Sequence, residues 1–259
     1  MTLFTFWRRH RQPFPAGWEA ILAADFAPYR LLSESDLASL RELVPTFLER
    51  TAFEGCNGQP ITDRVRLTIA AYACLLLLHR PNPGYPRLGT VLVYPTSFAA
   101  PVAETDAVGI VTEAVEERLG ESWEIGTLVL AWDSIAELCA GRGGGLNVIL
   151  HEFAHQIDLA EGVSDGALLH DGPAGCGDWS DLLQLEYRRL QAARRRGRPA
   201  VLDGYGATSV AEFFAVATET FFERPVRLKA HHPELYRQLA TIYRQDPAGW
   251  WLPITARPC

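Results

Sequence analysis

The chain has 259 residues, of which 48% are hydrophobic and 21% are charged, so it can bury one sizeable core. Its formal net charge is −7. Proteins that bind a nucleic-acid backbone neutralise phosphates with lysine and arginine, so this acidic balance argues against nucleic-acid binding as the main activity.

The five cysteines, at positions 56, 74, 139, 176 and 259, are odd in number and form no CxxC pair. This pattern argues against a disulfide framework and predicts reduced thiols, with Cys74 and Cys139 packed in the core. The N-terminal segment MTLFTFWRRHRQPFPAGW brings charges and prolines before any apolar run, unlike a signal peptide. The most apolar stretch, Leu67 to Leu78, is too short to span a bilayer. We therefore expect a cytoplasmic protein without a membrane segment.

The first predicted elements are two helices. Apolar residues recur at helical spacing over residues 33–53, where Ser33 or Ser35 can cap the helix. Pro45 lies inside this range and should kink or break the helix. A second helix is predicted over residues 62–79, before two prolines.

Two short β-rich segments follow, Thr90–Tyr94 and Thr127–Trp132, and both are predicted strands. Residues 108–119 lie between them and are expected to be irregular or partly helical. A short helix is predicted over residues 133–140. The glycine-rich segment 141–145 then lets the chain turn sharply before the next helix.

The C-terminal half is predicted to be mainly helical, and the arginine run at 194–196 is expected to be a solvated helix end. No repeat or long linker is visible, so we expect a single domain over residues 1–259. The predicted segments are a helix over 146–159, a loop over 160–178, a helix from Asp178 or Ser180 to about Arg196, a helix over 210–222 capped by Ser209, and a last helix over 233–245.

The chemically informative motif is His-Glu-Phe-Ala-His at residues 151–155. On a helix, positions i and i+4 share a face, so His151 and His155 can bind one Zn²⁺ ion together. Glu152 lies beside them and can take a proton from the attacking water. The rest of the helix is apolar, and burying these polar groups there is costly unless they are paired or bind a metal.

A catalytic zinc needs a third protein ligand, and two glutamates are candidates. Glu161 lies at or beyond the end of the motif helix, where its carboxylate would be solvated. Glu212 lies in an almost wholly apolar helix, where a carboxylate needs a partner. We therefore favour Glu212. The only methionine is Met1, which excludes the Met-turn class of zinc peptidases.

Three further residues have two interpretations each. Glu219 lies two turns after Glu212 on the same helix face and could orient a metal ligand or form a salt bridge near the helix end. Asp158 could hold an imidazole N–H or end the motif helix. Tyr205, in the segment DGYGATS, could donate to an oxyanion or serve packing.

The segments HEFAHQID and YGATSVAEFFAVATETFF resemble the Mlc titration factor A family of zinc peptidases. The resemblance extends over roughly residues 15–250. It implies that His151, His155 and Glu212 bind zinc, that Glu152 is the catalytic base, and that Tyr205 acts on the transition state. The implied fold is α+β, mostly helical, with a small β-sheet. It is zincin-like and gluzincin-like, and similar to the catalytic domain of anthrax lethal factor.

The resemblance also implies aminopeptidase-type hydrolysis of small peptides and, as in the founding member of the family, binding to the glucose repressor Mlc. We expect Thr127–Ala131 to be an edge strand against which an extended peptide substrate pairs. The alternative is a non-catalytic regulatory protein that sequesters a repressor and uses zinc for structure. The sequence favours the enzyme, because a structural zinc site needs no glutamate beside its first histidine.

Overall fold

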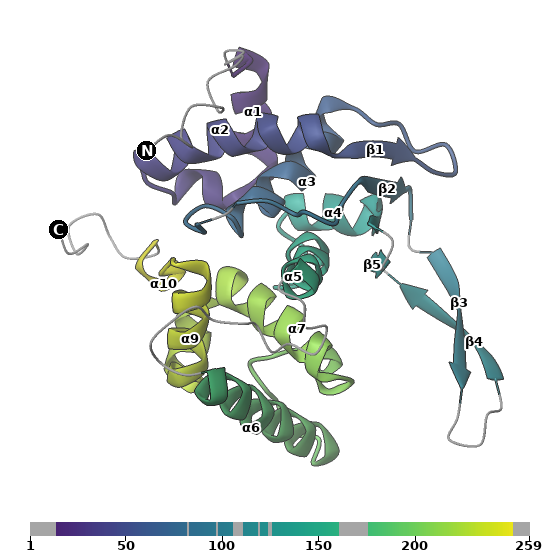
Figure 1. The fold of residues 1–259 in the computed structure, drawn as a ribbon, viewed down its shortest axis with the longest axis vertical. Helices are drawn as coiled ribbons and strands as arrows, with labels where there is room; N and C mark the ends of the chain where they lie inside the picture. The colour runs from purple at the N-terminus through teal and green to yellow at the C-terminus, as the bar shows by residue number, and fades with distance from the viewer. Residues whose placement is uncertain are drawn as a thin grey trace, which may run out of the picture.

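The computed structural model describes residues 14–81, 83–96, 98–105, 111–118, 120–123, 126–160 and 176–250, and helices predominate in them (Figure 1). In chain order the elements are α1 (Ala16–Asp25), the 3₁₀ turn η1 (Ala27–Arg30), α2 (Glu34–Arg50), β1 (Ala52–Gly55), α3 (Asp63–Leu75), β2 (Thr90–Tyr94), β3 (Phe98–Thr105), β4 (Val111–Arg118), β5 (Gly120–Trp123), β6 (Thr127–Ala131), α4 (Trp132–Cys139), α5 (Val148–Ala160), α6 (Cys176–Arg195), the 3₁₀ turn η2 (Gly204–Ala207), α7 (Val210–Glu223), α8 (Pro225–His231), α9 (Pro233–Tyr243) and α10 (Pro247–Trp250).

Helix α5 occupies the middle of the fold (Figure 1). It contacts α3, α4, β5 and β6 on one side and α7 on the other. Helices α6 and α9 pack in turn around α7, on the side away from the sheet. This arrangement confirms the expected mostly helical α+β fold with a small sheet.

The main sheet has four described strands in the order β1-β2-β6-β5. Strands β1, β2 and β6 are parallel, whereas β5 is antiparallel to β6. Strand β6 therefore lies inside the sheet, and the expectation that Thr127–Ala131 forms an edge strand is wrong. Strand β5 follows β6 in the strand order and forms that edge of the sheet. Its ladder with β6 runs from Gly120 opposite Leu130 to Trp123 opposite Thr127.

Strands β3 and β4 form a separate antiparallel ribbon, paired from Phe98 opposite Arg118 to Thr105 opposite Val111. The expectation that residues 108–119 are irregular or partly helical is therefore wrong for Val111–Arg118. Cross-strand pairing decides such a segment more than its own residue preferences do.

Helix α2 shows both the success and the limit of local sequence rules. Ser33 caps it as predicted, because its hydroxyl accepts a hydrogen bond from the backbone N–H of Asp36 at 3.1 Å. The helix continues through Pro45 to Arg50 and so does not break there. Proline removes one backbone hydrogen bond, and burial of the apolar face that packs on α3 offsets that loss.

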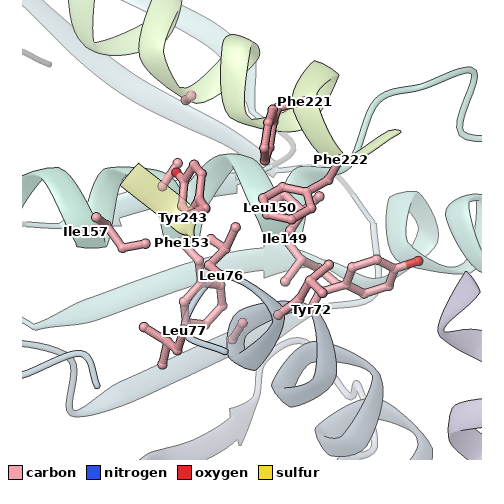
Figure 2. Close-up of a cluster of buried hydrophobic side chains, with 14 of the residues drawn as sticks. Tyr72, Leu76, Leu77, Ile149, Leu150, Phe153, Ile157, Phe221, Phe222 and Tyr243 are labelled. Carbon is pink, nitrogen blue, oxygen red and sulfur yellow. The ribbon is translucent and has the colours of Figure 1, made fainter. Parts of the chain in front are cut away.

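The core is built where α3, α5, α7 and α9 meet, as Figure 2 shows. Phe153 of α5 packs against Tyr85 with ring centroids 4.8 Å apart, and Phe221 of α7 stacks on Tyr243 of α9 at 5.8 Å. The buried residues labelled in the figure are Tyr72, Leu76, Leu77, Ile149, Leu150, Phe153, Ile157, Phe221, Phe222 and Tyr243. The apolar faces of α5 and α7 are thereby fixed against each other and against α3.

Cys74 is fully buried in this core, as predicted, and Cys139 packs against it. Neither forms a disulfide, and Cys56 is also a free thiol. Within the described ranges, no helix has both the length and the apolar character required to cross a bilayer.

Two predicted boundaries in the C-terminal half are wrong. Helix α6 begins at Cys176, so neither Asp178 nor Ser180 is its N-cap. Helix α9 ends at Tyr243 and is not the last helix, because α10 follows it at Pro247–Trp250. Arg244, with a positive φ of 53°, reverses the chain between them, a conformation that residue preferences do not anticipate for arginine.

Candidate metal centre

The glycine-rich segment before α5 forms the sharp turn that its sequence predicts. Gly141, Gly144 and Gly145 have φ values of 73°, 62° and 89°, which favour glycine strongly. The helix itself begins at Val148, two residues later than expected, because Asn147 caps it. The Asn147 side-chain oxygen accepts a hydrogen bond from the backbone N–H of Leu150 at 3.1 Å.

His151 and His155 lie one turn apart on the face of α5 that points toward α7. Their Nε2 atoms are 3.3 Å apart and their ring centroids 4.9 Å apart. Both side chains are mostly buried, with 12% and 16% exposure. The i, i+4 spacing of the motif thus brings both imidazoles to one point, as predicted.

Glu212 reaches the same point from the first turn of α7. Ser209 caps that helix by accepting a hydrogen bond from the backbone N–H of Glu212 at 3.1 Å. The Glu212 Oε2 atom then lies 2.8 Å from His151 Nε2 and 3.5 Å from His155 Nε2. The competing candidate, Glu161, lies outside the described residues.

These three donors can hold a metal ion, since all three ligand atoms lie within 4.8 Å of one another. Ligand atoms at about 2.0–2.2 Å from a tetrahedral ion are about 3.3–3.6 Å apart. The 3.3 Å and 3.5 Å separations match that geometry. The remaining separation, 2.8 Å, is a hydrogen-bond distance and has to lengthen by about 0.5 Å around an ion of this kind. Two imidazoles and one carboxylate are a donor set that suits zinc.

A second carboxylate orients the first histidine. Glu219, two turns after Glu212 on α7, places Oε1 2.7 Å from His151 Nδ1. Its Oε2 atom accepts a hydrogen bond from the backbone N–H of Asn147 at 2.7 Å. A carboxylate on Nδ1 fixes the ring and its tautomer, so that Nε2 faces the metal position.

Asn147 and Glu223 belong to this arrangement, and neither was predicted. The Asn147 side-chain amide donates to Glu223 Oε1 at 2.7 Å, and Asn147 is fully buried. Two signals were available: an asparagine directly before an apolar helix suggests a cap, and Glu219 and Glu223 are one turn apart on one face. Neither signal shows that the two helices pack together.

Glu152 is buried, with 5% exposure, next to the three donors. Burial raises the pKa of its carboxyl above the ordinary value, and the neighbouring histidines only partly offset this. A carboxylate with a raised pKa is more basic than a solvated one, which suits a group that accepts a proton.

The charges of His151, Glu212 and Glu219 are strongly coupled. Burial lowers the pKa of His151, but its hydrogen bonds to Glu212 and Glu219 outweigh burial and hold this pKa well above its ordinary value. Burial raises the pKa of Glu212, yet the two histidines reverse that effect and leave its pKa far below the usual range. These two pKa shifts show that the site strongly favours a positive charge next to Glu212.

The two remaining candidates lie close to the site. Tyr205 is in η2, 46% exposed, with its ring centroid 5.9 Å from that of His151. Asp158 is buried within α5, which continues to Ala160, so it does not end the helix.

A pair of histidines one turn apart, a glutamate beside the first and a carboxylate from a second helix are characteristic of metallopeptidases. The sequence matches the family described as glucose-regulated metallo-peptidase M90 over residues 4–244, and the chain belongs to that family.

Relatives match along most of the chain. A protein of Synechocystis sp., described as uncharacterized, is 39% identical over 245 residues, which cover 93% of this chain and 89% of the relative. Proteins named Mlc titration factor A are more distant. The one from Klebsiella pneumoniae is 28% identical over 89% of this chain and 86% of its own length. The one from Salmonella arizonae is 27% identical over 84% and 86%.

Proposed function

We propose that this protein is a zinc-dependent peptidase of the aminopeptidase type, with His151, His155 and Glu212 as the zinc ligands. The observation that carries the proposal is that these three donors converge beside the buried side chain of Glu152. We also propose that residues 1–259 form one catalytic domain, since α5 packs against both the sheet and α7.

In the proposed mechanism, a zinc ion held by His151, His155 and Glu212 would supply Lewis acidity, which lowers the pKa of water toward neutral pH and polarises a carbonyl group. Glu152 takes a proton from the attacking water and passes it to the leaving amine. Glu219 holds the His151 ring in place through Nδ1. Tyr205, exposed and close to His151, donates its hydroxyl proton in a hydrogen bond to the developing oxyanion.

The substrate in this proposal is an extended peptide that adds to the sheet at β5. This strand pairs with β6 alone among the described strands and lies close to α5. An extended chain beside it would form main-chain hydrogen bonds while its scissile bond lies near the histidines.

A second candidate function is regulatory binding of a Mlc-like transcriptional repressor, which the names of the relatives at 27–28% identity favour. This function is compatible with peptidase activity. In its non-catalytic form, zinc would be structural, and such sites close with four protein ligands. The described metal-binding group has three, which favours the enzyme.

The deciding experiment compares wild type with Glu152→Gln on chromogenic aminoacyl substrates and on peptides with blocked N-termini, with and without a chelator. The variant keeps the shape of the side chain and removes the base, so we expect hydrolysis to fall by about 10²–10⁴-fold while zinc and repressor binding remain. Glu137→Gln, on the exposed surface of α4, is the matched control and should retain activity.

Activity of Glu152→Gln within a few-fold of wild type would show that another group activates the water. A wild-type protein that hydrolyses neither substrate set, yet binds a repressor, would favour the non-catalytic alternative. Cleavage of the blocked peptides but not of the free aminoacyl substrates would replace the aminopeptidase assignment with an endopeptidase.

A further inference from the structure

A cavity of about 370 Å³ opens between the C-terminal end of α6, the segment 197–204 and the junction of α7 with α8. None of the residues that line it belongs to the metal centre. Its size is at the lower end of small-molecule sites, which occupy about 300–1,000 Å³.

Three arginines line this cavity, namely Arg194, Arg198 and Arg224. No described carboxylate lies within salt-bridge distance of any of them. By contrast, Arg189 on the same helix α6 pairs with Glu186 at 2.5 Å. Of the three, Arg224 packs its guanidinium against Gly145 and lies next to Glu223, so Arg194 and Arg198 are the arginines available to a ligand in the cavity.

One carboxylate, Asp203, also lines the cavity. Its Oδ1 atom accepts a hydrogen bond from the backbone N–H of Tyr205 at 2.8 Å and so caps η2. Arg194 and Arg198 against Asp203 leave an excess of one positive charge beside the cavity. A phosphate monoester carries a charge of about −1.5 to −2 at pH 7 and accepts bidentate hydrogen bonds from arginine.

Another part of the wall is apolar. Leu190, Val201 and Leu202 line the cavity and are almost fully buried, with 4%, 6% and 3% exposure. These side chains are held by the core and present a fixed surface to the organic part of a ligand.

The geometry points to this cavity as a binding site for a small organic phosphate. The phosphate lies against Arg194 and Arg198, and the organic part lies against the apolar wall. Binding at this site does not depend on the peptidase activity proposed above.

The test is isothermal titration of the full chain with phenyl phosphate and with inorganic phosphate, at constant ionic strength. We expect saturable binding, with phenyl phosphate the tighter of the two because it also covers the apolar wall. Arg198→Gln and Arg194→Gln should each weaken phenyl phosphate binding by about tenfold or more, since each removes a charge-assisted contact.

Arg195→Gln and Arg196→Gln are the matched controls, because these exposed neighbours do not line the cavity. We expect each to change the affinity by less than about twofold. Arg224 is not substituted in this test, because its guanidinium packs against Gly145 in the turn before α5. Thermal unfolding of each variant confirms that it is folded.

Absence of saturable binding to wild type would overturn the proposal. So would equal losses in Arg195→Gln and Arg198→Gln, which would indicate a diffuse charge effect. Phosphate bound at the metal centre would be insensitive to Arg198→Gln, and that result would also overturn it. Inorganic phosphate that binds as tightly as phenyl phosphate would contradict the role of the apolar wall.

Discussion

The His151 ring is held at both nitrogens by carboxylates from the same helix, α7. Nε2 lies 2.8 Å from Glu212, and Nδ1 lies 2.7 Å from Glu219. The two glutamates are seven residues apart, two helical turns, so one face of α7 supplies both contacts. This arrangement assigns different tasks to two similar side chains: one faces the metal position and the other orients the ring.

We predict that Glu219→Gln weakens zinc binding by about 10–100-fold, the usual effect of losing a partner that orients a ligand. The amide places a donor or a weaker acceptor against Nδ1. Glu223→Gln is the control, because Glu223 contacts Asn147 and not His151. Competition with a zinc-binding dye measures both. Equal losses in the two variants would show a general effect on the packing of α5 against α7 instead of a specific effect on His151.

The third ligand is tested by a second pair of variants. Glu212→Ala should weaken zinc binding sharply, because one of three protein ligands disappears and neighbouring Phe213 and Phe214 offer no donor. Glu161→Ala should leave the affinity nearly unchanged. The same dye competition ranks the two. Loss of metal in Glu161→Ala and retention in Glu212→Ala would move the third ligand to the segment directly after α5.

At the scale of elements, α6 and α9 are joined by a charge cluster around the buried carboxylate of Glu186. Glu186 of α6 has 3% exposure, with Oε2 2.8 Å from His232 Nδ1, at the start of α9, and Oε1 2.5 Å from Arg189. Burial raises the pKa of Glu186, but His232 and Arg189 outweigh it and leave this pKa below its ordinary value. The cluster therefore stabilises the packing of α6 against α9 while Glu186 is ionised.

We predict that Glu186→Gln lowers the free energy of unfolding by about 1–3 kcal/mol at pH 7, the cost of losing hydrogen bonds to charged groups. A depressed folded-state pKa contributes stability above the unfolded value of about 4.3, and this contribution disappears as pH falls through the folded value. The difference from wild type should thus narrow as pH falls below about 4.

Urea unfolding at several pH values measures this difference. Glu137→Gln is the control, since Glu137 pairs with Arg142 on the exposed surface and should contribute nothing measurable. A Glu186→Gln difference that persists unchanged or grows below about pH 4 would contradict the assignment of an ionised Glu186 to this cluster.

Local sequence rules predicted the elements that carry their own signals. Helices α5 and α7 have apolar faces at helical spacing, and Ser209 caps α7 as expected. Strands β1 and β5 have only four residues each, AFEG and GESW, which show no alternation long enough to identify a strand. These strands depend on pairing with β2 and β6, and that pairing is not encoded locally.

In the metal centre, too, some residues could be predicted from the sequence and others could not. His151, Glu152 and His155 are adjacent in sequence, and Glu212 was identified because a carboxylate in an apolar helix needs a partner. The contacts of Asn147 with Glu219 and Glu223 join residues 72 and 76 positions apart. They exist only because α5 packs against α7, a geometry that residue spacing alone does not contain.

For the whole molecule, the position of α5 links metal binding to global stability. The helix that carries both histidines also packs against α3, the sheet and α7. An ion that bridges α5 and α7 through Glu212 binds the folded state and not the unfolded chain. A ligand at about 1,000 times its dissociation constant stabilises a folded protein by about 4 kcal/mol. Chelation should therefore lower the unfolding temperature together with the activity.

The most direct test of the central claim is the zinc content of the purified chain, measured by mass spectrometry of the metal without added zinc, alongside peptide hydrolysis. We predict about one equivalent of zinc per chain, complete loss of hydrolysis on chelation, and recovery of both activity and unfolding temperature when zinc is restored. A folded chain that holds far less than one equivalent, takes up no zinc when it is supplied, and keeps its unfolding temperature in chelator would contradict the account.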